Sequence, residues 1–232
     1  GLLGGAAALS AIGPAAFSLG ARDAFAASAP KLPARGNFVI RKATVLTMDK
    51  DLGDIKDGDV HVRDGVIVAV GQNLNTPGAR TIDGRGMIVL PGLVETHWHM
   101  WNTLLRGMSG EKPDYSYFRT ALMLGKLCTA DDIYQGTRLA TAEAINSGIT
   151  FVHDWAHNVR GPDYARADLR ALKESGLRAR FSYGPSQGHD VKTTIDLPDL
   201  EKLKNDWARY SNEGLIALGV AWRGHGGTLP AN

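Results

Sequence analysis

The chain has 232 residues, 44% of them hydrophobic and 22% charged, with a formal net charge of +2. These values are ordinary for a globular protein. A net charge this small does not indicate a nucleic-acid-binding protein. The single cysteine, Cys128, excludes an internal disulfide framework and a multi-cysteine zinc site. Because it falls in an apolar helical pattern, we interpret it as a buried structural thiol.

Residues 1–29 have the composition of an export signal. Gly1–Ala21 is uncharged, and Ala24–Ala26 and Ala27–Ala29 each fit a small-x-small cleavage site. The mild hydrophobicity favours a twin-arginine signal over a stable membrane span, and therefore a periplasmic location. The alternatives are an uncleaved anchor and a disordered leader of a cytoplasmic protein. Residues 30–36 are expected to form a linker.

A small, mostly antiparallel β unit is predicted for residues 37–92. Apolar and polar residues alternate along its strands, and Asp64-Gly65 is a hairpin turn between two of them. His61 falls on a strand and is interpreted as a surface residue, not a ligand. The strands are expected at Asn37–Met48, Gly58–Val62, Val66–Val70, Thr81–Asp83 and Met87–Leu90.

From Leu93 onward, strand-like runs alternate with helix-like runs, which predicts βαβ units around a parallel sheet. Thr129 and Asp132 form a capping box that opens a helix, and Gly148 closes it. Strands are expected at Leu93–Thr96, Ile149–His153, Leu177–Tyr183 and Leu215–Ala221, and helices at Tyr115–Leu127, Ala130–Asn146, Asp163–Ser175 and Leu197–Ser211.

The first strand of this region ends in His97, Trp98 and His99. Residues two apart on a strand point to the same side, so both imidazoles are expected to project together. Imidazole is the commonest side-chain metal ligand. His97 and His99 therefore indicate half of a metal site, although a bare His-x-His is a weak signal by itself.

The surrounding residues resemble the amidohydrolase superfamily, in order along the chain from about Asn37 to Trp222. Val89–His99, reading VLPGLVETHWH, resembles its first barrel strand. Thr103–Gly107, reading TLLRG, resembles the branch of heterocycle deaminases, triazine hydrolases and S-adenosylhomocysteine deaminases. Further similar stretches are Asp64–Gly71, Ile82–Gly86 and Ser147–Asp154.

The resemblance implies an α/β fold: the first half of a TIM-type (β/α)8 barrel over residues 93–232, preceded by the N-terminal part of a composite β-sandwich over residues 37–92. A complete barrel takes about 250 residues. We therefore expect the chain to be an incomplete piece of a longer protein. In the family, two further histidines and an aspartate from strands five, six and eight complete the metal site.

The resemblance also implies one divalent ion, zinc as the first expectation and Fe²⁺ as the alternative. The expected fourth strand has no lysine, which favours a mononuclear site over a binuclear one. Since barrel active sites lie at the carboxyl ends of strands, substrate contacts are predicted at Trp101, Arg106, His153 and Asp154. For His153 and Asp154 the alternative is that they only shape the pocket. Glu95 is expected to orient the site, and no residue of this chain is assigned as catalytic acid or base.

The expected function is hydrolytic deamination, or dechlorination or deamidation, of an aromatic nitrogen heterocycle by a metal-activated water. The substrate is a small molecule, and a homo-oligomer is compatible with this function. Two alternatives stay open: a cyclic-amide hydrolase of the same superfamily, and a catalytically inactive fragment that lacks the remaining ligands.

Overall fold

The computed structural model describes residues 36–186, 188 and 195–221. The export-signal prediction and nearly all of the expected linker lie outside the described residues. The chain divides after Pro91 into two compact units, and this division falls within one residue of the boundary expected from the sequence. Each unit is described here by itself.

The first unit is a five-stranded sheet in the order β3-β2-β1-β4, with β5 also paired to β1. The Asp64-Gly65 turn joins β2 and β3, and both residues have positive φ (53° and 81°), as a tight hairpin requires. The prediction of a mostly antiparallel unit was wrong in part, because β4 and β5 pair parallel to β1. The strands are β1 (Asn37–Leu46), β2 (Asp54–Arg63), β3 (Val66–Gly71), β4 (Arg80–Asp83) and β5 (Ile88–Val89).

His61 on β2 corrects one sequence interpretation. It is not a surface residue, since its side chain is buried and its Nε2 lies 2.6 Å from Asn37 Oδ1 on the neighbouring strand. Val60 packs on the opposite side of β2, in a small core with Ala43 and Val45 of β1. Apolar burial on one face and a hydrogen-bonded histidine on the other fix the register of the two strands.

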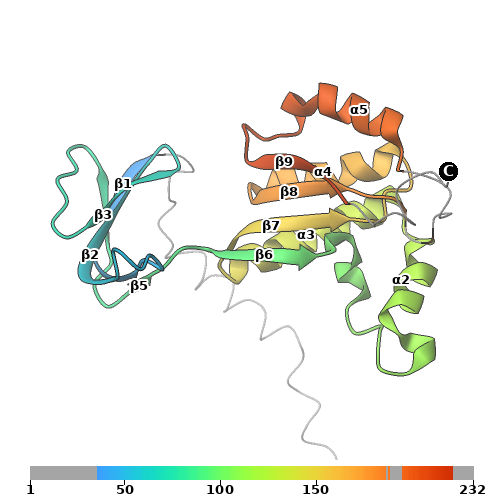
Figure 1. The fold of residues 1–232 in the computed structure, drawn as a ribbon, viewed down its shortest axis with the longest axis horizontal. Helices are drawn as coiled ribbons and strands as arrows, with labels where there is room; N and C mark the ends of the chain where they lie inside the picture. The colour runs from blue at the N-terminus through green and yellow to red at the C-terminus, as the bar shows by residue number, and fades with distance from the viewer. Residues whose placement is uncertain (1–35, 187, 189–194, 222–232) are drawn as a thin grey trace, which may run out of the picture. The chain divides into compact units, whose positions relative to one another are not determined.

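The second unit is a four-stranded, all-parallel sheet in the order β6-β7-β8-β9, as predicted (Figure 1). Successive strands are joined by helices, the arrangement of consecutive βαβ units. The strands are β6 (Leu93–Trp98), β7 (Ile149–Ala156), β8 (Arg178–Tyr183) and β9 (Ile216–Val220). The helices are η1 (Met100–Leu105), η2 (Pro113–Tyr115), α2 (Tyr117–Gly125), α3 (Ala130–Asn146), α4 (Pro162–Ser175), α5 (Leu197–Asn205) and η3 (Trp207–Arg209).

The helix ends follow from local sequence. Thr129 accepts the N–H of Asp132 and Asp132 accepts that of Thr129, so the predicted capping box at the start of α3 is confirmed. Two predicted helices are shorter than expected. The region at Tyr115–Leu127 begins as a 3₁₀ turn and becomes α-helical only at Tyr117, and α5 ends at Asn205, before a separate 3₁₀ turn.

Three helices cover one face of the sheet, which we call the helix face. Its core contains small and branched side chains such as Ala144 of α3, Leu172 of α4, Leu203 of α5 and Val152 of β7. The opposite surface, the inner face, carries the alternate residues of the same strands, including His153 and Ser182. Within the described ranges, no helix has the length and apolar character needed to cross a bilayer.

Candidate metal centre

His97 and His99 lie at the carboxyl end of β6, the end where barrel enzymes place their active sites. Their ring centroids are 5.7 Å apart, with the planes at 84°. Two imidazoles on one tetrahedral zinc, with Zn–N distances of about 2.1 Å, have centroids roughly 5 Å apart. The pair therefore has nearly the spacing that a shared ion requires.

Each histidine is restrained by a neighbour. The carboxylate of Glu95 accepts the backbone N–H of His97 at 2.7 Å, which is an orienting contact of the kind expected from the sequence. Nδ1 of His99 lies 3.1 Å from the carbonyl oxygen of Trp155 at the end of β7. A carbonyl oxygen can only accept, so this nitrogen carries the proton and Nε2 of His99 is left as the electron-pair donor.

These donors fit a divalent metal ion as part of a ligand set. Neutral imidazoles are suitable ligands for zinc and iron, and a catalytic zinc site takes three protein ligands. No cluster of three or more His, Cys, Asp or Glu residues in the described part of the chain is arranged to hold an ion. The pair would accordingly need donors from residues beyond the described ones.

His157 is among the histidines at strand ends that the sequence leaves as structural or supporting residues, and it lies beside His99, with ring centroids 4.3 Å apart. It follows β7, is almost fully buried, and its Nδ1 is 3.3 Å from the indole nitrogen of Trp101. The parity of β6 could not place it there, since it comes from a different strand. It supports His99 from beneath.

The sequence placed the end of β7 at His153, but the strand continues to Ala156. His153 therefore lies within the strand, on the inner face, and its Nε2 is hydrogen-bonded to Ser182 Oγ of β8 at 2.7 Å. Burial and the positive charge of Arg180 lower the pKa of His153. At neutral pH this imidazole is neutral and can donate or accept one hydrogen bond on the inner face.

Asp154 is not the substrate contact that the sequence predicted. Its side chain points to the helix face and has no exposed surface. Its Oδ1 accepts the N–H of Met100 at 3.3 Å, and its carboxyl group also interacts with that of Asp168 on α4. Burial, followed by the nearby carboxyl of Asp168 on α4, raises the pKa of Asp154 well above its usual value.

Trp101 was predicted to stack on a flat substrate, and this prediction was wrong. Only 2% of its surface is exposed, because η1 turns the indole inward against Ala121 of α2 and Ile133 of α3. The period-two pattern of β6 could not be extended past His99, where the 3₁₀ helix begins. Trp101 is a core residue that supports the turn after the histidines.

Arg106 was predicted to hold a substrate oxygen, but its guanidinium is already paired. Both terminal nitrogens donate to the carboxylate of Glu143 on α3, each at 2.5 Å. This is the bidentate geometry that arginine prefers with a carboxylate. The pair raises the pKa of Arg106 and lowers that of Glu143, and it fastens the end of η1 to α3.

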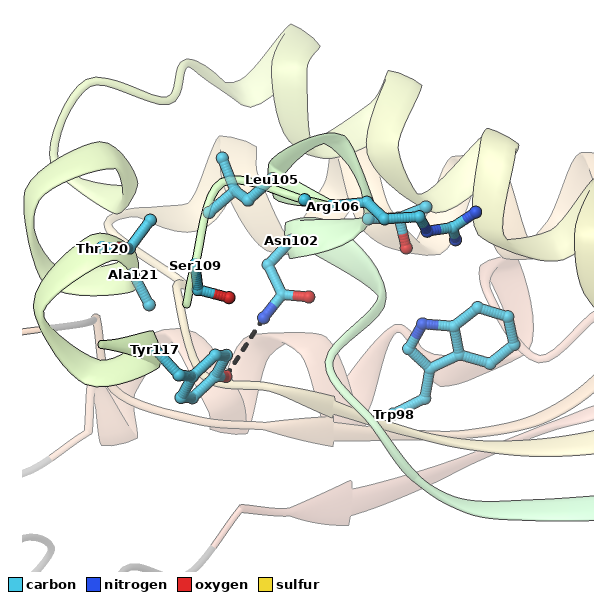
Figure 2. Close-up of a pocket in the computed structure, with 10 residues that line it drawn as sticks. Trp98, Asn102, Leu105, Arg106, Ser109, Tyr117, Thr120 and Ala121 are labelled. Carbon is cyan, nitrogen blue, oxygen red and sulfur yellow. Dashed lines mark hydrogen bonds between the residues drawn. The ribbon is translucent and has the colours of Figure 1, made fainter. Parts of the chain in front are cut away.

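A hollow of about 300 Å³ opens beside this turn. Figure 2 shows Trp98 and Arg106 along one side and Tyr117, Thr120 and Ala121 of α2 along the other. Asn102 donates to the hydroxyl of Tyr117 at 3.1 Å across it, and the Tyr117 ring is stacked 6.4 Å from that of His99. The sequence analysis did not single out Asn102 of η1 or Tyr117 of α2, because no motif marks either residue.

A family comparison decides what this architecture is. The model of the amidohydrolase family matches residues 88–225. The chain belongs to the amidohydrolase family. The match includes β6 with both histidines and continues through β9.

Curated relatives and solved structures cover the same part of the family. The chain is 33% identical over 173 residues to 5'-deoxyadenosine deaminase of Methanosarcina acetivorans, spanning 74% of this chain and 39% of that protein. It is 33% identical over 166 residues to 5-methylthioadenosine/S-adenosylhomocysteine deaminase of Pelotomaculum thermopropionicum, spanning 69% and 37%. The sequence therefore covers about two fifths of the length of these relatives.

The zinc complex of atrazine chlorohydrolase from Arthrobacter aurescens has the same fold, with a TM-score of 0.59 and 24% identity. The match covers 79% of this chain and 46% of that one. At this identity the likeness shows the fold alone. It confirms that β6–β9 and their helices correspond to part of an amidohydrolase barrel.

Proposed function

We propose that this chain supplies the first part of a metal-dependent hydrolase that deaminates an aromatic nitrogen heterocycle. The observation that supports it most directly is the His97–His99 pair, whose ring centroids lie 5.7 Å apart at the carboxyl end of β6. Both named relatives are deaminases of adenosine derivatives. An amino-substituted purine-like ring is accordingly the proposed substrate class.

The metal, when bound, lowers the pKa of a water and makes hydroxide available near neutral pH. His97 and His99 would hold it, with zinc as the ion of choice because the related chlorohydrolase binds zinc. The contact to Trp155 keeps Nε2 of His99 in its electron-donating form. The ring of Tyr117 lies nearly parallel to that of His99, with centroids 6.4 Å apart.

The inner face would receive the heterocycle. His153 is half-exposed there, and the buried hydroxyl of Ser182 holds its Nε2. The neutral imidazole is suited to contact the polar edge of such a ring. Arg106 and Trp101 are not available for this task, because one is paired with Glu143 and the other is buried. His153 is therefore the substrate contact that we retain from the sequence prediction.

The experiment is a turnover screen of the protein with all its barrel units present. Zinc-loaded protein is incubated with adenosine, 5'-deoxyadenosine, guanine, a chlorinated triazine and a cyclic amide, and ammonia release, chloride release and ring opening are measured. Ammonia release from an adenine-containing substrate supports the proposal. Chloride release alone, or ring opening of a cyclic amide alone, would contradict the proposed substrate class.

We also propose export. The support is the uncharged segment 1–21 and the two small-x-small sites before residue 30. N-terminal sequencing of the protein recovered from periplasm should give a first residue at 27 or 30. Recovery of Gly1–Ala21 on the mature protein would contradict a cleaved signal.

A further inference from the structure

Two consecutive residues of β7 restrain the chain at His99 from different sides. The carbonyl oxygen of Trp155 accepts from the imidazole of His99. The side chain of Asp154 accepts from the backbone N–H of Met100, the residue directly after it. One contact fixes the ring, and the other fixes the main chain that carries it.

His99 lies at the point where the strand ladder of β6 ends and η1 begins. His99 precedes η1 with φ −106° and ψ 83°, which is neither helical nor extended, and no side chain caps this end of η1. The register between β6 and β7 is also interrupted between Glu95 and Trp98. The ladder resumes only at the pair Trp98–Asp154, so Asp154 is the residue of β7 that lies opposite the chain just before His99.

Asp154 is built into the interior as an anchor. It is fully buried on the helix face, next to Asp168 of α4, which is buried in turn and accepts the hydroxyl of Thr137 on α3 at 2.8 Å. Burying two neighbouring carboxyl groups away from water lowers stability. The hydrogen bond from Met100 to Asp154 attaches the turn after His99 to β7.

The packing of η1 against α3 limits where that turn can go. A Cβ at Gly136 of α3 would lie 2.6 Å from the carbonyl oxygen of Trp101, so the two backbones are already in close contact. α3 packs against the turn, and Asp154 accepts the N–H of Met100. Both contacts restrain Met100 and, through it, the direction in which His99 projects.

We propose that Asp154 is a positioning residue for the metal ligand His99. It acts through Met100, without touching metal or substrate, and together with the Trp155 carbonyl it presents Nε2 of His99 to the ion. This inference rests on the proposed role of His99 as a ligand. Mutation of residues that orient a metal ligand from outside the coordination sphere typically weakens metal affinity about 10- to 100-fold.

The test compares zinc affinity, measured by competition with a chromophoric chelator, with stability to urea in the protein that carries the complete barrel. Asp154→Leu fills the same space without an acceptor and should raise the Kd for zinc about 10- to 100-fold. Asp154→Asn keeps an acceptor for Met100 and should stay within roughly threefold of the original Kd.

Asp199→Asn is the matched control. Asp199 is also a buried carboxylate, but its side chain is hydrogen-bonded to Arg166 of α4 and Tyr183 of β8 and not to η1. The Asp199→Asn variant should change the urea midpoint and keep the Kd for zinc within roughly threefold of the original value. If Asp154→Leu folds and binds zinc as tightly as the unaltered protein, the inference is overturned.

A second measurement does not depend on how well Asp154→Leu folds. Nitrogen-15 shifts of the His99 ring in metal-free protein should show the Nδ1–H tautomer, and Asp154→Asn should preserve it. The Nε2–H tautomer in the unaltered protein would overturn the inference. If zinc binds through His97 and His99 but no heterocycle is turned over, the result would contradict the proposed function and not this inference.

Discussion

The indole N–H of Trp101 points at Nδ1 of His157, 3.3 Å away, inside the packing between η1 and the end of β7. This contact joins the turn after β6 to the residues after β7. It also explains why Trp101 cannot meet a substrate, since its ring fills the space between α2 and α3.

Replacing Trp101 therefore tests a core role against a substrate role. Trp101→Ala should lower the free energy of unfolding by about 3–5 kcal/mol, the usual result of emptying a buried aromatic site. Trp101→Phe should lower it less and leave KM unchanged. A raised KM for Trp101→Phe at unchanged stability would favour the stacking role predicted from the sequence.

Arg106 and Glu143 are expected to act as one unit, because each terminal nitrogen of the guanidinium has an oxygen of the same carboxylate. Arg106→Lys and Glu143→Gln should both increase protease cleavage in the segment 105–112, and to a similar extent. KM should change equally in the two variants, if at all. A KM effect confined to Arg106→Lys would mean that the guanidinium meets the substrate.

Asp168 makes stability depend on pH. Burial raises its pKa from 3.8 to about 6, so the folded protein binds more protons than the unfolded chain between these values. The stabilisation is present in full below about pH 4 and is lost as pH rises through about 6. Asp168→Asn should flatten the fall in the urea midpoint between pH 4 and about 7. A midpoint with the same slope in both proteins would contradict this assignment.

Gly136 should tolerate no side chain, although it lies in the middle of α3. Alanine is favoured over glycine in a helix by about 1 kcal/mol. Here its Cβ would stand 2.6 Å from the Trp101 carbonyl oxygen, and overpacking against backbone costs about 1–3 kcal/mol. Gly136→Ala should therefore lower the melting temperature. An increase would show that η1 can move away from α3.

The order of elements and the position of the two histidines followed from the sequence, because period-two and helical patterns, the Asp64-Gly65 turn and the Thr129 cap are local signals. The neighbours of those residues did not follow. His61, Trp101 and Asp154 were misjudged because burial depends on which segments distant in the sequence pack against a residue, and no local pattern gives that. Glu143 as the partner of Arg106 comes from 37 residues away and has no local signal.

The central claim is that His97 and His99 hold the metal, and zinc analysis of the protein with its complete barrel tests it most directly. The unaltered protein should contain bound zinc, while His97→Ala and His99→Ala should each lose most of it and nearly all turnover. The 232-residue chain alone should bind zinc weakly, since a catalytic site needs about three protein ligands. Full zinc occupancy and activity in both variants would contradict the account.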